Sequence, residues 1–359
     1  MNYNNPYPGG RPPFPPPNQY PPYPPYPHFP AAEPPRRKEQ KEIRRFGNIF
    51  GTSTILMLPF TFALQFILYI VLFAAGAMEM DLQSGVITSG MDSLAVLLSN
   101  MLIYCASMLL PFLIVIMAKM TRVRYNDILP LGKPKKGWLA VSVGSGLGLF
   151  MLSNIIVGIM VSIVYGVSGI ELNVPAIDFP SAVSGQAVYF ITISVLPAFV
   201  EEIIFRGIVM QPLRKHGDKF ALIASSLLFA LMHGNFVQIP FAFILGIVIG
   251  YFVIKSESIW VGVLLHFLNN AFSCSYDFIK FYIGEQTAGL VSDIMMGAML
   301  LFGMIFTVFF LSSKKSKRFI PVESTLDEKG KIGAYLSSPG VIIAIAVYIC
   351  FSILTINIL

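Results

Sequence analysis

Long apolar runs separated by short polar connections fill the chain from residue 53 onward. Each run has about 17 to 28 residues, enough for a helix rising ~1.5 Å per residue to cross a bilayer core. The pattern predicts an all-α, polytopic transmembrane bundle of about eight or nine spans. The predicted spans are 53–78, 93–118, 138–165, 187–213, 219–236, 239–255, 258–281, 289–312 and 339–359.

The charges of the connections alternate along the chain and indicate an orientation. The connections 79–92 and 166–186 contain acidic residues but no Lys or Arg, whereas 119–137, 214–219 and 313–331 are rich in both. With the N-terminus in the cytoplasm, every Lys and Arg except Arg206 and Lys280 falls on the cytoplasmic side, as the positive-inside rule requires. We therefore expect a multi-pass protein of the bacterial plasma membrane with a cytoplasmic N-terminus.

Composition supports this reading and excludes others. Only 12% of the residues are charged, about half the share in a soluble domain, so a soluble protein and a coiled coil are excluded. The net charge of +6 follows from the topology, and it predicts no nucleic-acid partner. The expected surroundings are the lipid bilayer.

The N-terminal segment differs from the rest of the chain. The first 35 residues hold 15 of the 26 prolines, a composition typical of polyproline II or disorder. Together with the basic stretch at 36–45, this segment predicts a disordered Pro/Tyr-rich and basic cytoplasmic tail over 1–45, ahead of a transmembrane domain over 46–359. The tail is either a docking segment or a solvated spacer.

Costly polar residues gather in three of the predicted spans. The span 187–213 contains Glu201, Glu202 and Arg206, while His233 lies in 219–236. The span 258–281 contains His266, Asn269 and Asn270. A charge at the bilayer centre costs roughly 2.5–3.5 kcal/mol on insertion scales. Counted from the predicted cytoplasmic helix ends, Glu201, His233 and Asn270 all lie ~20 Å deep, which predicts one shared site.

Helical phase separates the two glutamates. Glu202 and Arg206 are four residues apart and can form a pair within one helix, which leaves Glu201 free to face a neighbouring helix. His266 and Asn270 likewise share a face. We expect Pro197, which removes a backbone hydrogen bond, to kink the helix beside the site.

These groups can carry out hydrolysis without a covalent nucleophile. A carboxylate beside an imidazole can act as a general base on water, and a second histidine with an amide can donate hydrogen bonds to an oxyanion. Three alternatives stay open: a polar cluster that specifies helix packing, a buried Glu/Arg/His path in a membrane transporter, and a catalytically silent immunity or scaffold protein of the same fold.

Three short motifs resemble a known family. EEIIFR (201–206), FALMH (229–233) and HFLNN (266–270) are similar, in order and spacing, to motifs of the CPBP intramembrane proteases. These proteases are also called the CAAX prenyl protease or Abi family and are relatives of the Ras-converting enzyme. The resemblance covers about 185–275.

The resemblance implies an intramembrane endopeptidase that hydrolyses peptide bonds of membrane-associated protein or peptide substrates. Glu201 and His233 would activate water, His266 and Asn270 would hold the oxyanion, and Glu202 and Arg206 would support them. We expect a glutamate-type enzyme without a cofactor, because the zinc motif His-Glu-x-x-His is absent from the sequence. The alternative is a metallo-endopeptidase whose zinc is held by Glu201, His233 and His266.

Two further patterns receive structural interpretations. The stretch VGSGLG at 143–148 is typical of close helix packing through small residues. Asp277 lies ~30 Å along its helix from the inner end, so we expect it at the outer interface.

Overall fold

The computed structural model describes residues 35–76, 78–80, 87–89, 93–119, 129–135, 137–172, 174, 179–312, 319 and 322–356. Apart from a short hairpin, in which β1 (Met78–Met80) pairs antiparallel with β2 (Ile87–Ser89), the regular structure of this part is helical. The predicted all-α class is therefore confirmed. The tail over 1–34 lies outside the described residues.

The helices follow one another with short connections. They are α1 (Pro35–Ala74), α2 (Ser93–Lys119), α4 (Trp138–Ser168), α5 (Val183–Phe190), η1 (Ile191–Val195), α6 (Leu196–Glu202), η2 (Ile203–Val209), α7 (Met210–Leu213), η3 (Arg214–His216), α8 (Asp218–Leu231), α9 (Gln238–Ser256), α10 (Ile259–Ile283), α11 (Glu285–Ser312), α12 (Glu328–Leu336) and α13 (Pro339–Ile356). The segments from α5 to η3 run on without a break, and we call them the composite helix.

Fewer helices of the described part meet the length and hydropathy expected of a membrane span than the sequence predicted. Within the described residues, six helices are long and apolar enough to cross a membrane, or seven if α12 and α13, bent by 68° at their break, form one span. The predicted fifth span corresponds to α8, whose 14 residues extend only ~21 Å, short of a ~30 Å hydrocarbon core. The predicted seventh span corresponds to α10, which is long enough at 25 residues but is rich in polar side chains.

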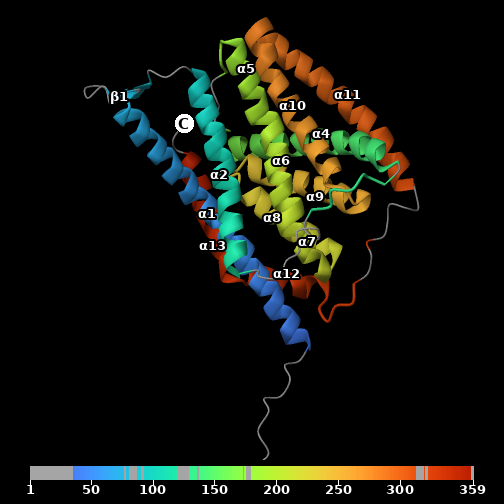
Figure 1. Cartoon of the computed structure of the whole chain (residues 1–359). Helices are drawn as coiled ribbons and strands as arrows, with labels where there is room; N and C mark the ends of the chain where they lie inside the picture. The colour runs from blue at the N-terminus through green and yellow to red at the C-terminus, as the bar shows by residue number, and fades with distance from the viewer. Residues whose placement is uncertain are drawn as a thin grey trace, which may run out of the picture.

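The composite helix occupies the middle of the bundle. Figure 1 shows it between α1 and α2 on one side and α10 and α11 on the other. We compare how much of each helix's most apolar 18-residue stretch is buried inside the protein. The buried share is 44% for the composite helix and 56% for α9, but only 6% for α1 and for α11. The outer helices therefore present their apolar side chains to lipid and shield the polar residues of the inner ones.

Glycines allow the closest helix contacts. A methyl group on Gly303 of α11 would lie 2.1 Å from Cα of Gly148 of α4, so the two backbones touch where neither residue has a side chain. Gly144 likewise faces the ring of Phe306. The predicted packing role of the 143–148 stretch is therefore confirmed.

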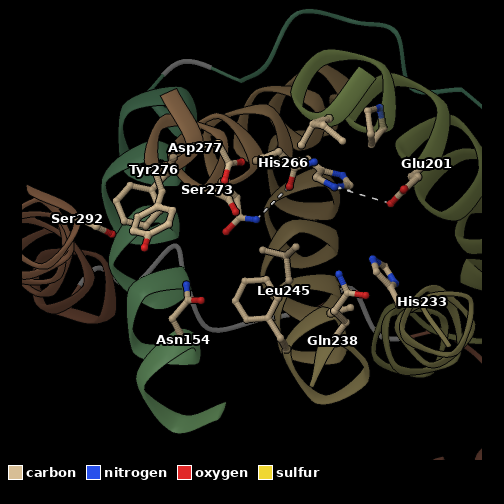
Figure 2. Close-up of a pocket in the computed structure, with 17 residues that line it drawn as sticks. Asn154, Glu201, His233, Gln238, Leu245, His266, Ser273, Tyr276, Asp277 and Ser292 are labelled. Carbon is tan, nitrogen blue, oxygen red and sulfur yellow. Dashed lines mark hydrogen bonds and ion pairs between the residues drawn. The ribbon is translucent and has the colours of Figure 1, made fainter. Parts of the chain in front are cut away.

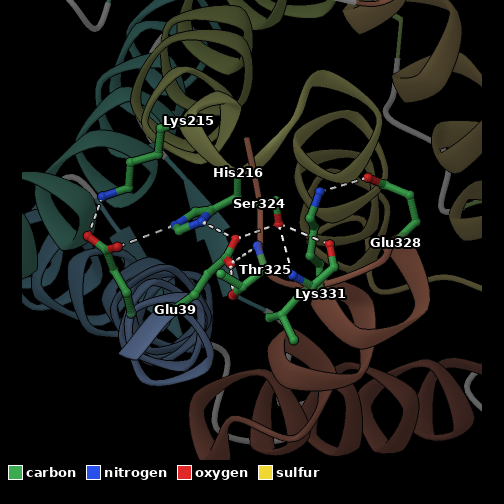
Figure 3. A network of polar contacts seen from close by, with 9 residues as sticks. Glu39, Lys215, His216, Ser324, Thr325, Glu328 and Lys331 are labelled. Atoms are coloured by element: carbon green, nitrogen blue, oxygen red, sulfur yellow. Dashed lines mark hydrogen bonds and ion pairs between the residues drawn. The ribbon is translucent and has the colours of Figure 1, made fainter. Parts of the chain in front are cut away.

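The start of α1 is anchored by polar contacts. Glu39 accepts hydrogen bonds from the backbone and hydroxyl of Thr325, at 2.8 and 2.6 Å, and from the hydroxyl of Ser324 at 2.8 Å. His216, at the end of the composite helix, lies 3.3 Å from the same carboxylate (Figure 3). We call these four residues the α1 clasp. Because α1 already begins at Pro35, the basic stretch 36–45 belongs to this helix, whereas the predicted tail had included it.

Candidate active site

A cavity of about 490 Å³ lies between the composite helix and α9, α10 and α4, within the size range of ligand-binding pockets. Glu201, His233, His266 and Asn270 line it, so the structure brings together four of the six predicted site residues. Glu202 and Arg206 lie behind this wall, almost fully buried. Figure 2 shows Glu201, His266 and His233 around one side of the cavity.

The backbone beside Glu201 and Glu202 is unusual. The two glutamates end α6, which lies between the two π-helical segments η1 and η2. In η1 the N–H of Leu196 donates to the carbonyl of Ile191, five residues back. Pro197 has no N–H to donate, and the wide turn lies directly before it, at the place where the sequence led us to expect a kink. Such π turns are frequent at functional sites.

The two oxygens of Glu201 have different surroundings. Tyr104 of α2 donates its hydroxyl to Oε1 at 2.5 Å. Oε2 lies 3.7 Å from Nε2 of His266 and has no hydrogen-bond partner among the described side chains and backbone. Tyr104 therefore holds one oxygen and leaves the other available to a molecule in the cavity. The sequence analysis missed Tyr104, which comes from a helix outside the three motifs.

Glu202 and Arg206 form the predicted pair. Nη1 of Arg206 lies 3.2 Å from Oε1 of Glu202, and the two side chains are only 1% and 0% exposed. The guanidinium also lies 4.3 Å from the ring centre of Phe229, a cation–π contact. The phase argument from the sequence is confirmed on this point.

His266 connects the two glutamates. Its Nδ1 lies 3.0 Å from Oε1 of Glu202, and because a carboxylate only accepts, this nitrogen carries a hydrogen. Two carboxylates and the Arg206 guanidinium sum to one negative charge. A further proton on His266 would make the buried set neutral, and Nε2 would then be a donor as well.

Hydrogen bonds also orient His233 and Asn270. Nδ1 of His233 donates to the carbonyl of Phe229 at 2.9 Å, so its Nε2 is an acceptor. The amide of Asn269 donates to Oδ1 of Asn270 at 3.2 Å, which leaves the amide hydrogens of Asn270 available. The sequence analysis named Asn269 in this span but gave it no role.

Asp277 lies at the other end of the same cavity, together with Ser273 and Tyr276 of α10. The sequence analysis placed Asp277 at the outer interface and gave it no role in the site. The signal was present in the sequence, because His266, Asn270, Ser273 and Asp277 follow the spacing of one helix face.

The residues do not form a metal site in this arrangement. In the part of the chain that the structure describes, no three His, Cys, Asp or Glu side chains are placed to hold a metal ion. Glu201, His233 and His266 are thus near one cavity without forming a zinc-binding set.

Comparisons with known proteins agree with the motifs. Residues 183–272 match the family model described as Type II CAAX prenyl endopeptidase Rce1-like. A curated relative, the membrane-embedded CAAX protease MroQ of Staphylococcus aureus (strain USA300), is 25% identical over 134 residues. This match covers 35% of the chain and 53% of MroQ, so the chain spans about half the length of this relative. No solved structure matches. The resemblance inferred from the three motifs is confirmed over residues 183–272, which are similar to Rce1-like CAAX prenyl endopeptidases and to a membrane-embedded CAAX protease.

Proposed function

We propose that the protein is an intramembrane endopeptidase that hydrolyses peptide bonds of membrane-associated protein or peptide substrates, as CAAX proteases do. The observation that carries the proposal is Oε2 of Glu201, which accepts no hydrogen bond from the described residues and belongs to a side chain that lines a 490 Å³ cavity. A buried carboxylate is too costly in a membrane helix to serve only as packing. General-base chemistry requires such a free acceptor.

The proposed reaction needs only water and the peptide. Oε2 of Glu201 and Nε2 of His233 accept hydrogen bonds from one water molecule, and Glu201 takes its proton as the water oxygen bonds to the carbonyl carbon. The carbonyl oxygen becomes an oxyanion, which accepts hydrogen bonds from Asn270 and protonated His266. The C–N bond then breaks, and the proton on Glu201 passes to the leaving amine.

Glu202, Arg206 and Tyr104 position these groups. Glu202 fixes the ring of His266 through Nδ1, and Arg206 balances the charge of Glu202. Tyr104 fixes the carboxylate of Glu201. None of the three needs to touch the substrate.

The test is a cleavage assay with the purified protein in liposomes. The probes are membrane-anchored fluorogenic peptides, one set farnesylated at a C-terminal CAAX sequence and one set without a prenyl group. Glu201→Gln keeps the shape of the side chain but cannot accept the proton, so the rate should fall by about 10²–10⁴ with little change in melting temperature. The control is Glu257→Gln, an exposed carboxylate paired with Lys135. Equal rates for wild type and Glu201→Gln would refute the proposal, and a transporter or silent scaffold would give that result.

The same assay separates the glutamate-type and metallo-endopeptidase forms of the proposal. We propose the glutamate type, so cleavage should survive a zinc chelator. The metallo form predicts a different result: the chelator would remove one zinc ion per chain and abolish cleavage, and added zinc would restore it. That result would assign Glu201, His233 and His266 to the metal.

We also propose that the N-terminus is cytoplasmic and that the membrane is a bacterial plasma membrane. The support is the distribution of Lys and Arg along the chain. Single cysteines introduced into 79–92 and into 214–219 should react with an impermeant reagent from opposite sides. Labelling of 79–92 from the cytoplasm would reverse the orientation.

A further inference from the structure

The cavity extends well beyond the residues that the proposed reaction uses. On α10 it is lined by His266, Asn270, Ser273 and Asp277, which are spaced by four, three and four residues and so lie along one helix face. The 11 residues from His266 to Asp277 correspond to ~16 Å along the helix. Figure 2 shows Asp277 on the opposite side of the cavity from Glu201 and His233. We call this extension the Asp277 arm.

The Asp277 arm is polar and carries a negative charge. Uncharged side chains, among them Asn154, Tyr276 and Ser292, line it beside Asp277. Among the described residues that line the whole cavity, none is Lys or Arg. A peptide lying in the cavity would therefore meet a carboxylate at each end and no fixed basic side chain.

The carboxylate of Asp277 is held in place without being neutralised. Tyr189 of α5 donates its hydroxyl to Oδ2 of Asp277 at 2.9 Å, which orients the carboxylate without supplying a counter-charge. The nearby cation, Lys280, is an exposed residue of the same helix and forms an ion pair with Glu285 at 3.2 Å. The Asp277 carboxylate at the end of the arm is thus held by a neutral hydroxyl, and the exposed Lys280, which it also senses, forms its ion pair with Glu285.

We infer that the Asp277 arm is a substrate subsite that binds a basic residue, lysine or arginine, of the peptide being cleaved. An ammonium or guanidinium group would pair with Asp277 in a site partly shielded from water, where charge pairs are stronger than at an open surface. An acidic residue would be repelled. This inference rests on the proposed protease function and adds a substrate class to it.

The length of the arm gives the position of the basic residue. An extended peptide advances about 3.3–3.6 Å per residue, so the ~16 Å between His266 and Asp277 corresponds to about four or five residues. The basic residue of a preferred substrate therefore lies about four or five positions from the cleaved bond.

The experiment measures charge preference by position. A membrane-anchored peptide carries one lysine, glutamate or alanine at each position from two to eight on either side of the cleaved bond. Wild type should cleave the lysine peptide about tenfold faster than the alanine peptide at position four or five, and the glutamate peptide more slowly. Asp277→Asn should bring the lysine-to-alanine ratio close to one, and Asp277→Lys should favour glutamate. Tyr189→Phe is the matched control, because it removes the hydrogen bond but keeps the charge and should keep the lysine preference.

The outcomes separate this inference from the function on which it rests. The same peptides are titrated against Glu201→Gln protein by fluorescence anisotropy, so preference is measured even where no bond is cleaved. The inference is overturned if lysine gives no preference, or if Asp277→Asn retains it. Cleavage that does not depend on Glu201 refutes the proposed mechanism instead. A purely structural Asp277 would lower the melting temperature in both Asp277→Asn and Tyr189→Phe without changing the preference in either.

Discussion

The intramembrane site and the α1 clasp use the same residue types, a glutamate beside a histidine, but they satisfy their carboxylates differently. In the clasp, both oxygens of Glu39 accept hydrogen bonds, from Ser324 and Thr325. In the membrane, Oε2 of Glu201 and of Glu202 have no hydrogen-bond partner in the described part of the chain. A polar cluster that only joins helices can satisfy all its acceptors, because an unsatisfied buried group costs about 1–3 kcal/mol. The clasp itself leaves Nε2 of His216 without a hydrogen bond, so the difference lies in the carboxylates: Glu39 is satisfied at both oxygens, whereas Glu201 keeps an acceptor beside the cavity.

The largest effect is expected when Glu202, whose charge balances Arg206, is replaced. Glu202→Gln leaves a guanidinium buried without its counter-charge, and breaking such a pair costs about 3–5 kcal/mol. We expect a lower melting temperature and a poor yield in detergent, before any effect on the chemical step. Adding Arg206→Met should recover much of the loss. If Glu202→Gln stays folded and inactive while Glu201→Gln melts early, the roles of the two glutamates are reversed.

A smaller effect is expected from the residue that holds Glu201 in place. Tyr104→Phe removes the hydrogen bond that holds Oε1 of Glu201 in place, so the carboxylate is less well oriented toward the water that it would activate. The rate at neutral pH should fall roughly tenfold, equivalent to ~1.4 kcal/mol and typical of one hydrogen bond. The matched control is Tyr348→Phe, since Tyr348 is a buried tyrosine of α13 that donates to the carbonyl of Thr54 at 2.8 Å. Both variants lose a buried hydrogen bond, but an equal loss of cleavage rate in Tyr348→Phe, or an unchanged rate in Tyr104→Phe, would contradict a positioning role for Tyr104.

The smallest effect is expected at the α1 clasp. Glu39→Gln weakens hydrogen bonds made to a charged acceptor and should cost about 1 kcal/mol of unfolding free energy, while cleavage by the folded protein stays the same. Glu42→Gln serves as the comparison, because Glu42 forms an ion pair with Lys215 in which both side chains are half exposed, and such pairs contribute roughly 0.2–1 kcal/mol. If the cleavage rate of folded Glu39→Gln fell, the α1 clasp would also contribute to activity, and it could not be called purely structural.

Two kinds of local pattern predicted parts of the site: the spacing of residues on one helix, and the distance of each residue from the cytoplasmic end of its helix. The four-residue spacing of Glu202 and Arg206 gave their pair, and equal depth brought Glu201, His233 and Asn270 to one cavity. Catalytic roles for these residues stay predictions, as do the disorder and the docking or spacer role of the tail.

Long-range contacts could not be found in this way. Tyr104 reaches Glu201 across 97 positions of sequence, and no local pattern marks a hydroxyl that a different helix brings to the site. The length of the fifth predicted span could not be read from the sequence either, because an apolar run does not reveal that the helix ends early, as α8 does at Leu231. The wide turns of η1 were also missed, since a proline predicts a lost hydrogen bond but not how the backbone adapts to it.

The contact between Gly148 and Gly303 restricts how a substrate can enter. With their backbones already touching, α4 and α11 cannot approach more closely or slide past one another without steric overlap. Both helices contribute to the cavity wall, through Asn154 and Ser292. If the proposed peptide substrate enters from the side, it must therefore pass between a different pair of helices, or α4 and α11 must move together as one rigid body.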